Sequence, residues 1–334
     1  MKPWKIALEE HVALPETLES ASTYLRGRPT LPQKLLDIHG ALLAEMDASG
    51  IEMSVLSLNA DGIQGILTKP EAITTARRAN DYLAEQVTKN SRRFQALAAL
   101  PMQDPEEAAK ELTRCVKDLG MKGALANGYT QLGEPDNILY YDQPEFWDFW
   151  GTVEALGVPF YLHARDPIAA SARNLQGHPW LWQSRWAFGV ETATHSLRLM
   201  ASGLFDKYPR LTIILGHLGE MLPNFMWRID HRINAWGANA SSAPPIKRRM
   251  NEYLRNNFYI TTSGNFCTST LMNVIQWMGS DRIMFSVDYP FEKMSQAGEW
   301  FDSVDVICDA DWEKIARKNA IRLLKLESAK ATSA

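Results

Sequence analysis

The chain has 334 residues, of which 46% are hydrophobic and 22% are charged, and its formal net charge is −4 at pH 7. This composition is typical of a globular enzyme and excludes a disordered chain and a long coiled coil. Because the Lys and Arg residues are interspersed with Asp and Glu, we expect no nucleic-acid partner.

The three cysteines, Cys115, Cys267 and Cys308, are widely spaced and include no CxxC pair, so neither a disulfide framework nor a zinc ribbon is indicated. The first residues lack the basic start and apolar run of a signal peptide. No apolar stretch approaches the roughly 20 residues that cross a bilayer. We therefore expect a cytoplasmic protein with no membrane partner.

Eight short runs of apolar and β-branched residues alternate with longer amphipathic segments along the chain. Such alternation is typical of a parallel sheet whose strands are joined by helices. The predicted strands are residues 5–11, 52–59, 94–100, 122–128, 159–165, 211–217, 258–264 and 282–288. Eight strands, each followed by a helix, predict an α/β fold, a single (β/α)8 TIM barrel domain that covers residues 1–334.

The predicted helix at 104–120 has the clearest ends, because Asp104 can cap its first turn, Pro105 takes the first helical position and Gly120 follows its end. Helical periodicity also runs through residues 69–90 and 309–326. Two long loops, residues 15–32 after the first strand and 165–187 after the fifth, are expected at the C-terminal rim of the barrel. Loops of this length are usually lids or interaction surfaces.

The predicted strands end in polar, chemically useful side chains more often than chance suggests. In a barrel these ends meet at one rim, where active sites are built. Three histidines and two acids there predict a metal site with the nitrogen and oxygen donors that suit a divalent ion. The polar strand ends are Glu9, His11, Asn59, Asn127, His163, His217, Ser263 and Asp288.

His217 and Glu220 lie three residues apart in the sequence GHLGE, at the start of a predicted helix. At that spacing the carboxylate can hydrogen-bond the imidazole and hold it as a general acid or base. Arg228, two turns further along, is equally compatible with a structural salt bridge and with a clamp for a substrate anion. The remaining histidines are interpreted as surface or packing residues: His39, His178, His195 and His231.

Six motifs, in order and spread over nearly the whole chain, resemble the metal-dependent aromatic decarboxylases of the amidohydrolase superfamily. They are ALEEH, FYLHAR, ILGHLGE, MWRIDH, ITTSGNF and RIMFSVDYPFE. Hydrolases of that superfamily commonly begin with His-x-His and place a carboxylated lysine at the end of strand four, where it bridges two metals. This chain has Glu-x-His and ends its fourth strand with LANG, so the resemblance implies one metal ion.

By this resemblance, one divalent ion, Zn²⁺ or Mn²⁺, is bound by Glu9, His11, His163 and Asp288. The implied catalytic residues are Asp288, His217, Glu220 and Arg228, and the implied substrate contacts are Tyr24, Asn127 and Ser263. The family also implies a homodimer or homotetramer, for which the tryptophan-rich segment 180–186 offers an aromatic contact surface.

The implied activity is the reversible, nonoxidative decarboxylation of an ortho-hydroxybenzoate, with 2,6-dihydroxybenzoate giving resorcinol and CO₂ and Asp288 protonating the ring carbon. One alternative is a decarboxylase of 2,3-dihydroxybenzoate or salicylate. Another is a mononuclear metallohydrolase such as a lactonase, in which Asp288 is the base toward a metal-activated water. A barrel that binds metal without turnover is the third alternative.

Overall fold

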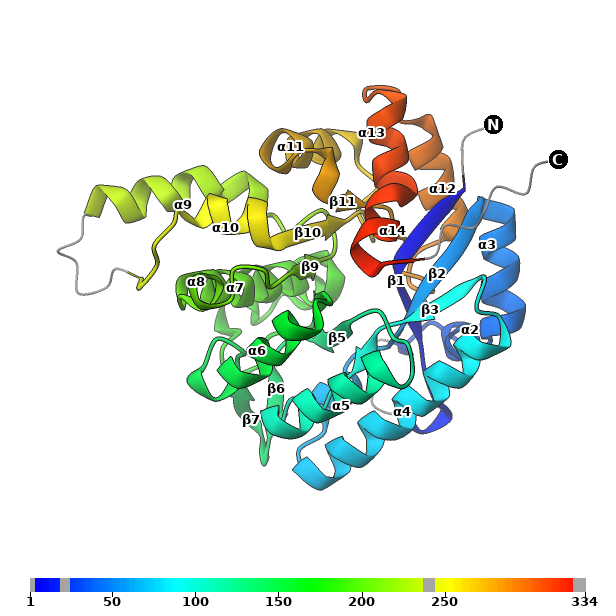
Figure 1. Cartoon of the computed structure of the whole chain (residues 1–334), viewed down its shortest axis with the longest axis horizontal. Helices are drawn as coiled ribbons and strands as arrows, with labels where there is room; N and C mark the ends of the chain where they lie inside the picture. Colours follow the sequence, from blue (N-terminus) through cyan, green and yellow to red (C-terminus); the bar gives the residue numbers. More distant parts are fainter. Residues whose placement is uncertain (1–3, 19–24, 237–243, 327–334) are drawn as a thin grey trace.

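The computed structural model describes residues 4–18, 25–236 and 244–326. Nine parallel strands carry the fold (Figure 1). One sheet consists of β1 (Lys5–Val12), β2 (Ile51–Leu58) and β3 (Phe94–Ala96). The other contains, in spatial order, β11 (Ile283–Met284), β10 (Phe258–Thr261), β9 (Ile213–Leu215), β8 (Phe160–His163), β5 (Ala124–Asn127) and β4 (Ala98–Ala99). The predicted α/β class with parallel strands is confirmed.

Backbone hydrogen bonds link the two sheets at both of their edges. Only Leu97 separates β3 from β4, and its N–H donates to Leu56 O at 2.9 Å. At the other edge the His11 N–H donates to Tyr289 O at 2.7 Å, and Glu10 forms a parallel bridge with Tyr289. Residues on β1 therefore lie beside those that follow β11, although nearly 280 positions separate them in the sequence.

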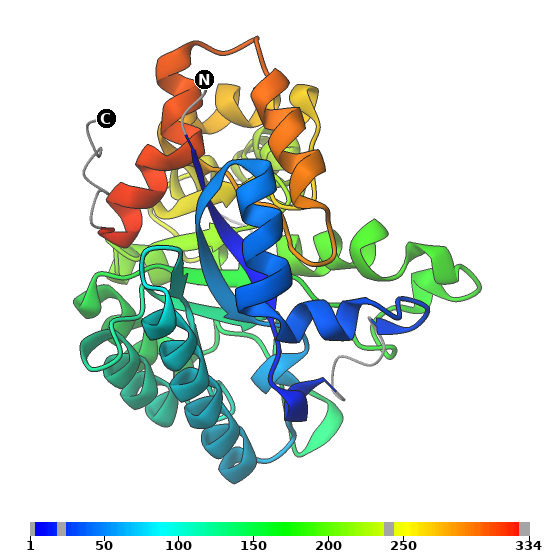
Figure 2. The ribbon, with the colours of Figure 1, turned by 90° about the vertical axis from the view of Figure 1, so that its right-hand side faces the viewer.

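Helices lie around the strands on the outside of the molecule (Figures 1 and 2). They are α2 (Leu31–Leu36), α3 (Leu43–Ser49), α4 (Lys69–Lys89), α5 (Pro105–Lys117), α6 (Trp147–Leu156), α7 (Ala187–Ala201), α8 (Leu204–Lys207), α9 (Leu222–Trp236), α10 (Met250–Asn257), α11 (Thr268–Met278), α12 (Met294–Ser303), α13 (Asp309–Glu313) and α14 (Asn319–Leu324). As predicted, Asp104 caps α5 by accepting a hydrogen bond from the Glu107 N–H at 3.3 Å. The predicted helix at 309–326 is instead interrupted by a π-helical turn, Lys314–Lys318.

An antiparallel hairpin, β6 (Thr130–Leu132) and β7 (Glu134–Leu139), was not predicted from the sequence. Its second strand begins with the exposed residues Glu-Pro-Asp-Asn, which lack the alternating apolar pattern of a half-buried strand. The long loop at 165–187 contains three short 3₁₀ turns, Arg173–Leu175, Pro179–Leu181 and Gln183–Arg185, and projects from the body of the molecule (Figure 2).

The interior of the strand arrangement is filled by a small apolar cluster to which every central strand contributes. The cluster also includes residues of α14 and Leu326, which lies two positions after this helix. Its members are Ile6, Leu8, Val55, Leu97, Leu125, Tyr161, Ile214, Tyr259, Met284, Ala320, Leu324 and Leu326. A much larger cluster packs the outer faces of the strands against the helices. Because the inner cluster fills the N-terminal side, polar side chains at the strands' C-terminal ends face a separate space.

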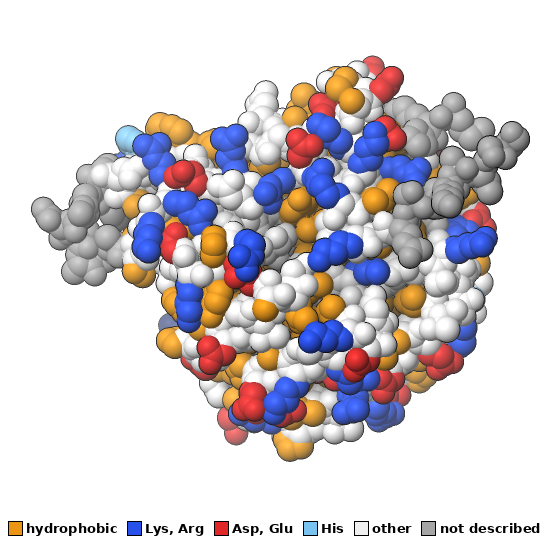
Figure 3. All heavy atoms as spheres, viewed as in Figure 1, with side chains coloured by type: hydrophobic (Ala, Val, Ile, Leu, Met, Phe, Trp, Pro, Cys, Tyr) orange, Lys and Arg blue, Asp and Glu red, His pale blue; other side chains and the backbone are white. Residues whose placement is uncertain are grey.

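The surface carries both signs of charge without a single-sign patch on the face shown in Figure 3. This pattern agrees with the small net charge of the chain. Within the part of the chain that the structure describes, no helix combines the length and the apolar character needed to span a membrane.

Buried His195 of α7 makes stability dependent on pH. Its Nε2 accepts a hydrogen bond from the Tyr141 N–H at 3.0 Å, and burial lowers the pKa of His195 from 6.5 to about 3. The unfolded chain therefore binds a proton between these two values that the folded chain does not, so stability is lost as the pH falls below about 6.5.

We expect the free energy of unfolding to fall between pH 7 and pH 5 by about 2 kcal/mol more in the wild-type protein than in His195→Gln, which cannot titrate. Denaturant unfolding at several pH values measures both slopes. Equal slopes for the two proteins would contradict this assignment.

Candidate metal centre and adjoining cavity

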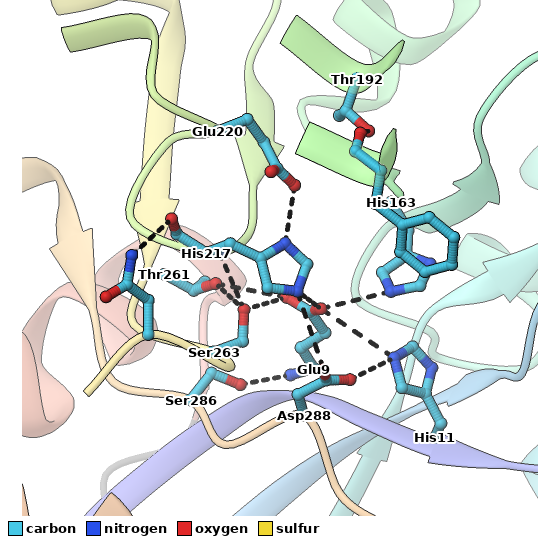
Figure 4. Close-up of polar contacts among 12 residues, drawn as sticks. Glu9, His11, His163, Thr192, His217, Glu220, Thr261, Ser263, Ser286 and Asp288 are labelled. Atoms are coloured by element: carbon cyan, nitrogen blue, oxygen red, sulfur yellow. Dashed lines mark hydrogen bonds and ion pairs between the residues drawn. The ribbon is translucent and has the colours of Figure 1, made fainter. Parts of the chain in front are cut away.

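Four side chains from three strand ends converge at one point (Figure 4). Glu9 and His11 lie on β1, His163 ends β8 and Asp288 follows β11. One donor atom from each residue lies within 4.8 Å of the others, and all four residues are buried. His163 Nε2 is 3.3 Å from Glu9 Oε1, and His11 Nε2 is 3.3 Å from Asp288 Oδ1.

The donor set fits a single divalent cation. Glu9 Oε1 and His11 Nε2 are buried, and no described residue forms a hydrogen bond with either atom. A buried polar atom without a hydrogen bond lowers the stability of the fold unless a ligand such as a metal ion binds it. Two imidazole nitrogens and two carboxylate oxygens are ligands that both zinc and manganese accept, and the two carboxylates offset the charge of the ion.

Hydrogen bonds from further side chains orient three of the four donors. Glu9 Oε2 accepts hydrogen bonds from the hydroxyl groups of Tyr161 and Ser263. His11 Nδ1 lies 3.2 Å from Ser57 Oγ, and His163 Nδ1 lies 2.7 Å from Asn127 Oδ1. Because their Nδ1 atoms are occupied, both imidazoles direct Nε2 toward the common point, which is how proteins fix metal-binding histidines.

The expected substrate contacts of Asn127 and Ser263 stay predictions, because the structure shows these side chains bonded to groups of the centre. Neither side chain lies on the cavity beside the donors. The Asn127 side-chain oxygen is hydrogen-bonded to His163 Nδ1. The Ser263 hydroxyl donates to Glu9 Oε2 and accepts from the His217 N–H. Both residues orient groups of the centre. Tyr24, the third expected contact, lies outside the described residues.

The pKa values of Glu9, Asp288 and His163 are all lowered in this centre. Burial raises the pKa of Glu9, but the imidazoles of His217, His163 and His11 outweigh it and bring the pKa well below its usual range. Burial raises the pKa of Asp288, but the facing imidazoles of His11 and His217 outweigh this effect and hold the pKa below its ordinary value. Burial lowers the pKa of His163, which leaves the neutral imidazole that metal binding requires.

His217 is the cationic member of the site. Burial lowers its pKa, but the carboxylates of Glu220 and Glu9 overcome this effect and raise the pKa of His217 well above the ordinary value. Its Nδ1 is 2.6 Å from Glu220 Oε1, as the sequence spacing predicts. Its Nε2 lies 3.5 Å from Glu9 Oε1 and 3.7 Å from Asp288 Oδ2, so His217 is placed between its own carboxylate partner and the metal donors.

The local backbone around His217 differs from the predicted helix start. His217, Leu218, Gly219, Glu220 and Met221 all have positive φ, from 51° to 84°, and α9 begins only at Leu222. A run of non-glycine residues in this region is strained and persists only where the surroundings impose it. The turn is tied down by the Leu218 N–H, which donates to Thr261 O at 2.9 Å.

A cavity adjoins the donors and contains residues that the sequence analysis did not select. It is lined by the predicted strand ends Asn59, His163, His217 and Asp288, together with Arg28, Ala60, Gln183, Ser184, Phe188, Phe291 and Glu292. An outer cavity of about 360 Å³ shares Ser184, Phe188, His217, Asp288 and Glu292 with it. The long loop at 165–187 therefore contributes to the walls of both cavities.

Arg228 does not line either cavity. It lies on α9 with an exposed side chain, and the described residues form no ion pair with it. Within the described residues the structure therefore shows neither an anion clamp nor a salt bridge at Arg228, and both interpretations stay predictions.

Glu10 is a buried acid beside the metal centre that the sequence patterns did not single out. It is fully buried on the face of β1 opposite Glu9 and His11. Its Oε1 accepts from the Val287 N–H at 3.1 Å and its Oε2 from the Tyr289 N–H at 3.2 Å, so the carboxylate holds the backbone on both sides of Asp288. The available signal was a second acid inside an otherwise apolar strand, since such a side chain needs buried donors.

Known proteins provide three comparisons. The family model described as Amidohydrolase matches residues 36–326. The gamma-resorcylate decarboxylase of Rhizobium sp. (strain MTP-10005) is 54% identical over 327 residues, which cover 97% of this chain and 99% of that protein. A crystal structure of 2,6-dihydroxybenzoate decarboxylase complexed with 2,6-dihydroxybenzoate has a TM-score of 0.93 and 54% identity, and the match covers 97% of this chain and 100% of that one.

A second solved structure bears on the metal. The dihydroxybenzoic acid decarboxylase of Polaromonas sp. JS666, which holds manganese and the inhibitor 2-nitroresorcinol, has a TM-score of 0.93 and 54% identity, with 97% of each chain covered.

Glu10→Gln tests whether the buried carboxylate positions Asp288. Glutamine offers only one acceptor oxygen, so one of the two backbone N–H groups loses its partner. We expect the affinity for Mn²⁺ to fall about 10- to 100-fold and the free energy of unfolding to fall by about 1–3 kcal/mol. Calorimetric metal titration and denaturant unfolding measure these effects.

The matched control is Glu52→Gln. Glu52 lies on the neighbouring parallel strand β2, is partly exposed, and forms an ion pair with Arg317 at 3.2 Å. Its effect on stability should stay below about 1 kcal/mol, with no change in metal affinity. Unchanged metal affinity in Glu10→Gln would refute the positioning role.

Proposed function

Because this chain belongs to the amidohydrolase family, with residues 36–326 matched, we propose that it is a metal-dependent decarboxylase that converts 2,6-dihydroxybenzoate to resorcinol and CO₂ in a reversible reaction. The observation that carries the proposal is a mononuclear Glu, His, His, Asp centre beside a His217–Glu220 pair. It occurs in a chain that is 54% identical, over nearly its whole length, to gamma-resorcylate decarboxylase.

We also propose that the strands form a closed (β/α)8 barrel in one domain, residues 1–334, with β3 and β4 acting as one strand. The hydrogen bonds from Leu97 to Leu56 and from His11 to Tyr289 support closure at the two sheet edges. This arrangement explains why donors from β1, β8 and the end of β11 share one rim.

The bound ion, Zn²⁺ or Mn²⁺, supplies a Lewis acid and a template for the substrate's carboxylate and ortho oxygen. Decarboxylation must avoid a bare aryl anion, so a proton first adds to the ring carbon that bears the carboxylate. The resulting dienone-like ring then releases CO₂, and the electron pair of the broken bond restores aromaticity. Asp288 stands at the cavity wall and delivers this proton.

Asp288 needs a source of protons, because its pKa is held below the ordinary value by His11 and His217 against the opposing effect of burial. His217 Nε2 is 3.7 Å from Asp288 Oδ2 and belongs to a cationic imidazole. We assign His217, with Glu220 behind it, the role of returning a proton to Asp288 and of stabilising negative charge on the substrate.

A homodimer or homotetramer is part of this proposal. Exposed aromatic side chains lie on the long loop, at the start of α7 and on α9: Trp180, Trp186, Phe225 and Trp227. Because Arg228 lies on the same α9, an anion clamp by Arg228 requires such an assembly. The three cysteines are free thiols, which suits a cytoplasmic location.

The metallohydrolase alternative uses the same donors, with Asp288 as base toward a water molecule. The decarboxylase is preferred because the relatives and solved structures that match the chain over 97% of its length are named as decarboxylases. The same matches favour 2,6-dihydroxybenzoate over 2,3-dihydroxybenzoate and salicylate.

The purified protein should release CO₂ from 2,6-dihydroxybenzoate, and a chelator should abolish the release until Mn²⁺ or Zn²⁺ is restored. With resorcinol and concentrated bicarbonate, the same sample should form the carboxylated product. Headspace CO₂ and liquid chromatography of the aromatic compounds provide the measurements. If a protein shown to contain metal released no CO₂, the proposed function would be wrong.

Asp288→Asn should lower kcat by about 10²- to 10⁴-fold, because the amide cannot deliver the proton but keeps an oxygen toward the metal. Binding of 2,6-dihydroxybenzoate should persist in protein whose metal content has been checked. The control is Asp136→Asn on the exposed strand β7, which should retain wild-type kcat. Full activity in Asp288→Asn would end the assignment of this residue as proton donor.

A further inference from the structure

Gln183 combines two features that are unusual for its place in the fold. Its φ is 61°, in the left-handed region that favours glycine. The residue nevertheless lines the cavity beside the metal donors. A residue held in a strained conformation at a cavity wall suggests that the side chain contributes something that glycine would not.

The surrounding loop fixes the Gln183 backbone. The Gln183 N–H donates to Asp166 Oδ1 at 2.7 Å, across the 17 positions that separate the two residues. Asp166 is itself anchored, because its carbonyl oxygen accepts the Tyr129 hydroxyl at 2.9 Å. The two hydrogen bonds close the base of the loop, so Gln183 cannot relax its φ without breaking the contact with Asp166.

The side-chain amide of Gln183 is available to a ligand. No hydrogen bond joins it to another residue in the described part of the chain. Among the other polar residues of the same cavity, His163 and Asp288 belong to the metal donors, His217 is paired with Glu220, and the Asn59 amide donates to Ala60 O. Arg28, Ser184 and Glu292 also line the cavity, but none of them carries a side-chain amide. An amide offers both a donor and an acceptor, which matches a neutral phenolic hydroxyl that can also do both.

We propose that Gln183 determines substrate specificity by hydrogen-bonding the second ring hydroxyl of the substrate, the one that is not held by the metal. This inference rests on the proposed function, because it assumes a 2,6-dihydroxylated ring in the cavity. Asp166 is a positioning residue, which acts by holding the Gln183 backbone. A site built to pair a hydroxyl discriminates against a ring without it, since the amide is then left unpaired.

The test compares pairs of ligands that differ by one hydroxyl. The metal-loaded enzyme is assayed for kcat/KM with 2,6-dihydroxybenzoate and with salicylate, which lacks the second hydroxyl. Calorimetry gives the Kd values of 2-nitroresorcinol and 2-nitrophenol, which differ in the same way and do not react. Binding still reports on Gln183 if no CO₂ is released, so failure of the proposed function and failure of this inference are distinguishable.

Gln183→Gly removes the amide and relieves the left-handed strain. We expect the preference for the dihydroxylated member of each pair to fall about tenfold or more, while Tm stays the same or rises. A fall of the same size for both members of a pair, or no change in preference, would overturn the proposal.

Three further variants separate recognition from folding. Lys325→Gly, at the left-handed position after α14 (φ 51°), should leave the preference unchanged. Asp166→Ala should reduce the preference as Gln183→Gly does, whereas Asp166→Asn keeps an acceptor oxygen for the Gln183 N–H and should restore it. If Asp166→Ala kept the full preference, the positioning role of Asp166 would be refuted.

Discussion

Two buried carboxylates on neighbouring positions of one strand are the constraint on which the site depends. Glu9 and Glu10 are both fully buried and point to opposite faces of β1. Each needs compensation, because an isolated buried charge is far too costly to keep. Glu9 obtains it from hydroxyl donors and facing imidazoles. Glu10 accepts hydrogen bonds from the backbone N–H groups around Asp288, but burial outweighs them and raises the pKa of Glu10 well above its ordinary value. The contacts of both acids join β1 to the segments that follow β10 and β11, where the metal donors meet.

Backbone strain is concentrated where the chemistry takes place. Seven described non-glycine residues have a clearly positive φ, and all but Lys325 lie at the cavities or in the turn that carries His217. Strain of this kind lowers stability locally and is kept only where packing and hydrogen bonds impose it. Here it fixes the direction of His217, Glu220, Asp288 and Gln183 before a ligand arrives, which is the preorganisation that electrostatic catalysis uses.

The pKa shifts favour a protonated His217 and ionised Glu9 and Asp288. The pKa of His217 is raised against the effect of burial, while the pKa values of Glu9 and Asp288 are lowered against it. A cation and two anions in one pocket favour binding of a divalent ion and of an anionic aromatic substrate together. The same arrangement places a proton on His217, 3.7 Å from the carboxylate proposed to use it.

Local sequence patterns determined the parallel α/β class, the positions of eight strand regions and the residues at their ends, because strand periodicity and helix caps depend on neighbours in the chain. They also indicated the His217–Glu220 contact, although the contact forms across a left-handed turn and not within the predicted helix. Tertiary structure alone decided that Asn127 and Ser263 stand behind the donors, that Arg228 lies exposed on α9, and that Gln183 reaches the cavity. Those outcomes depend on which distant segment meets each side chain, and Glu10 shows why: its partners lie almost 280 positions away and become visible only when the first and last strands are side by side.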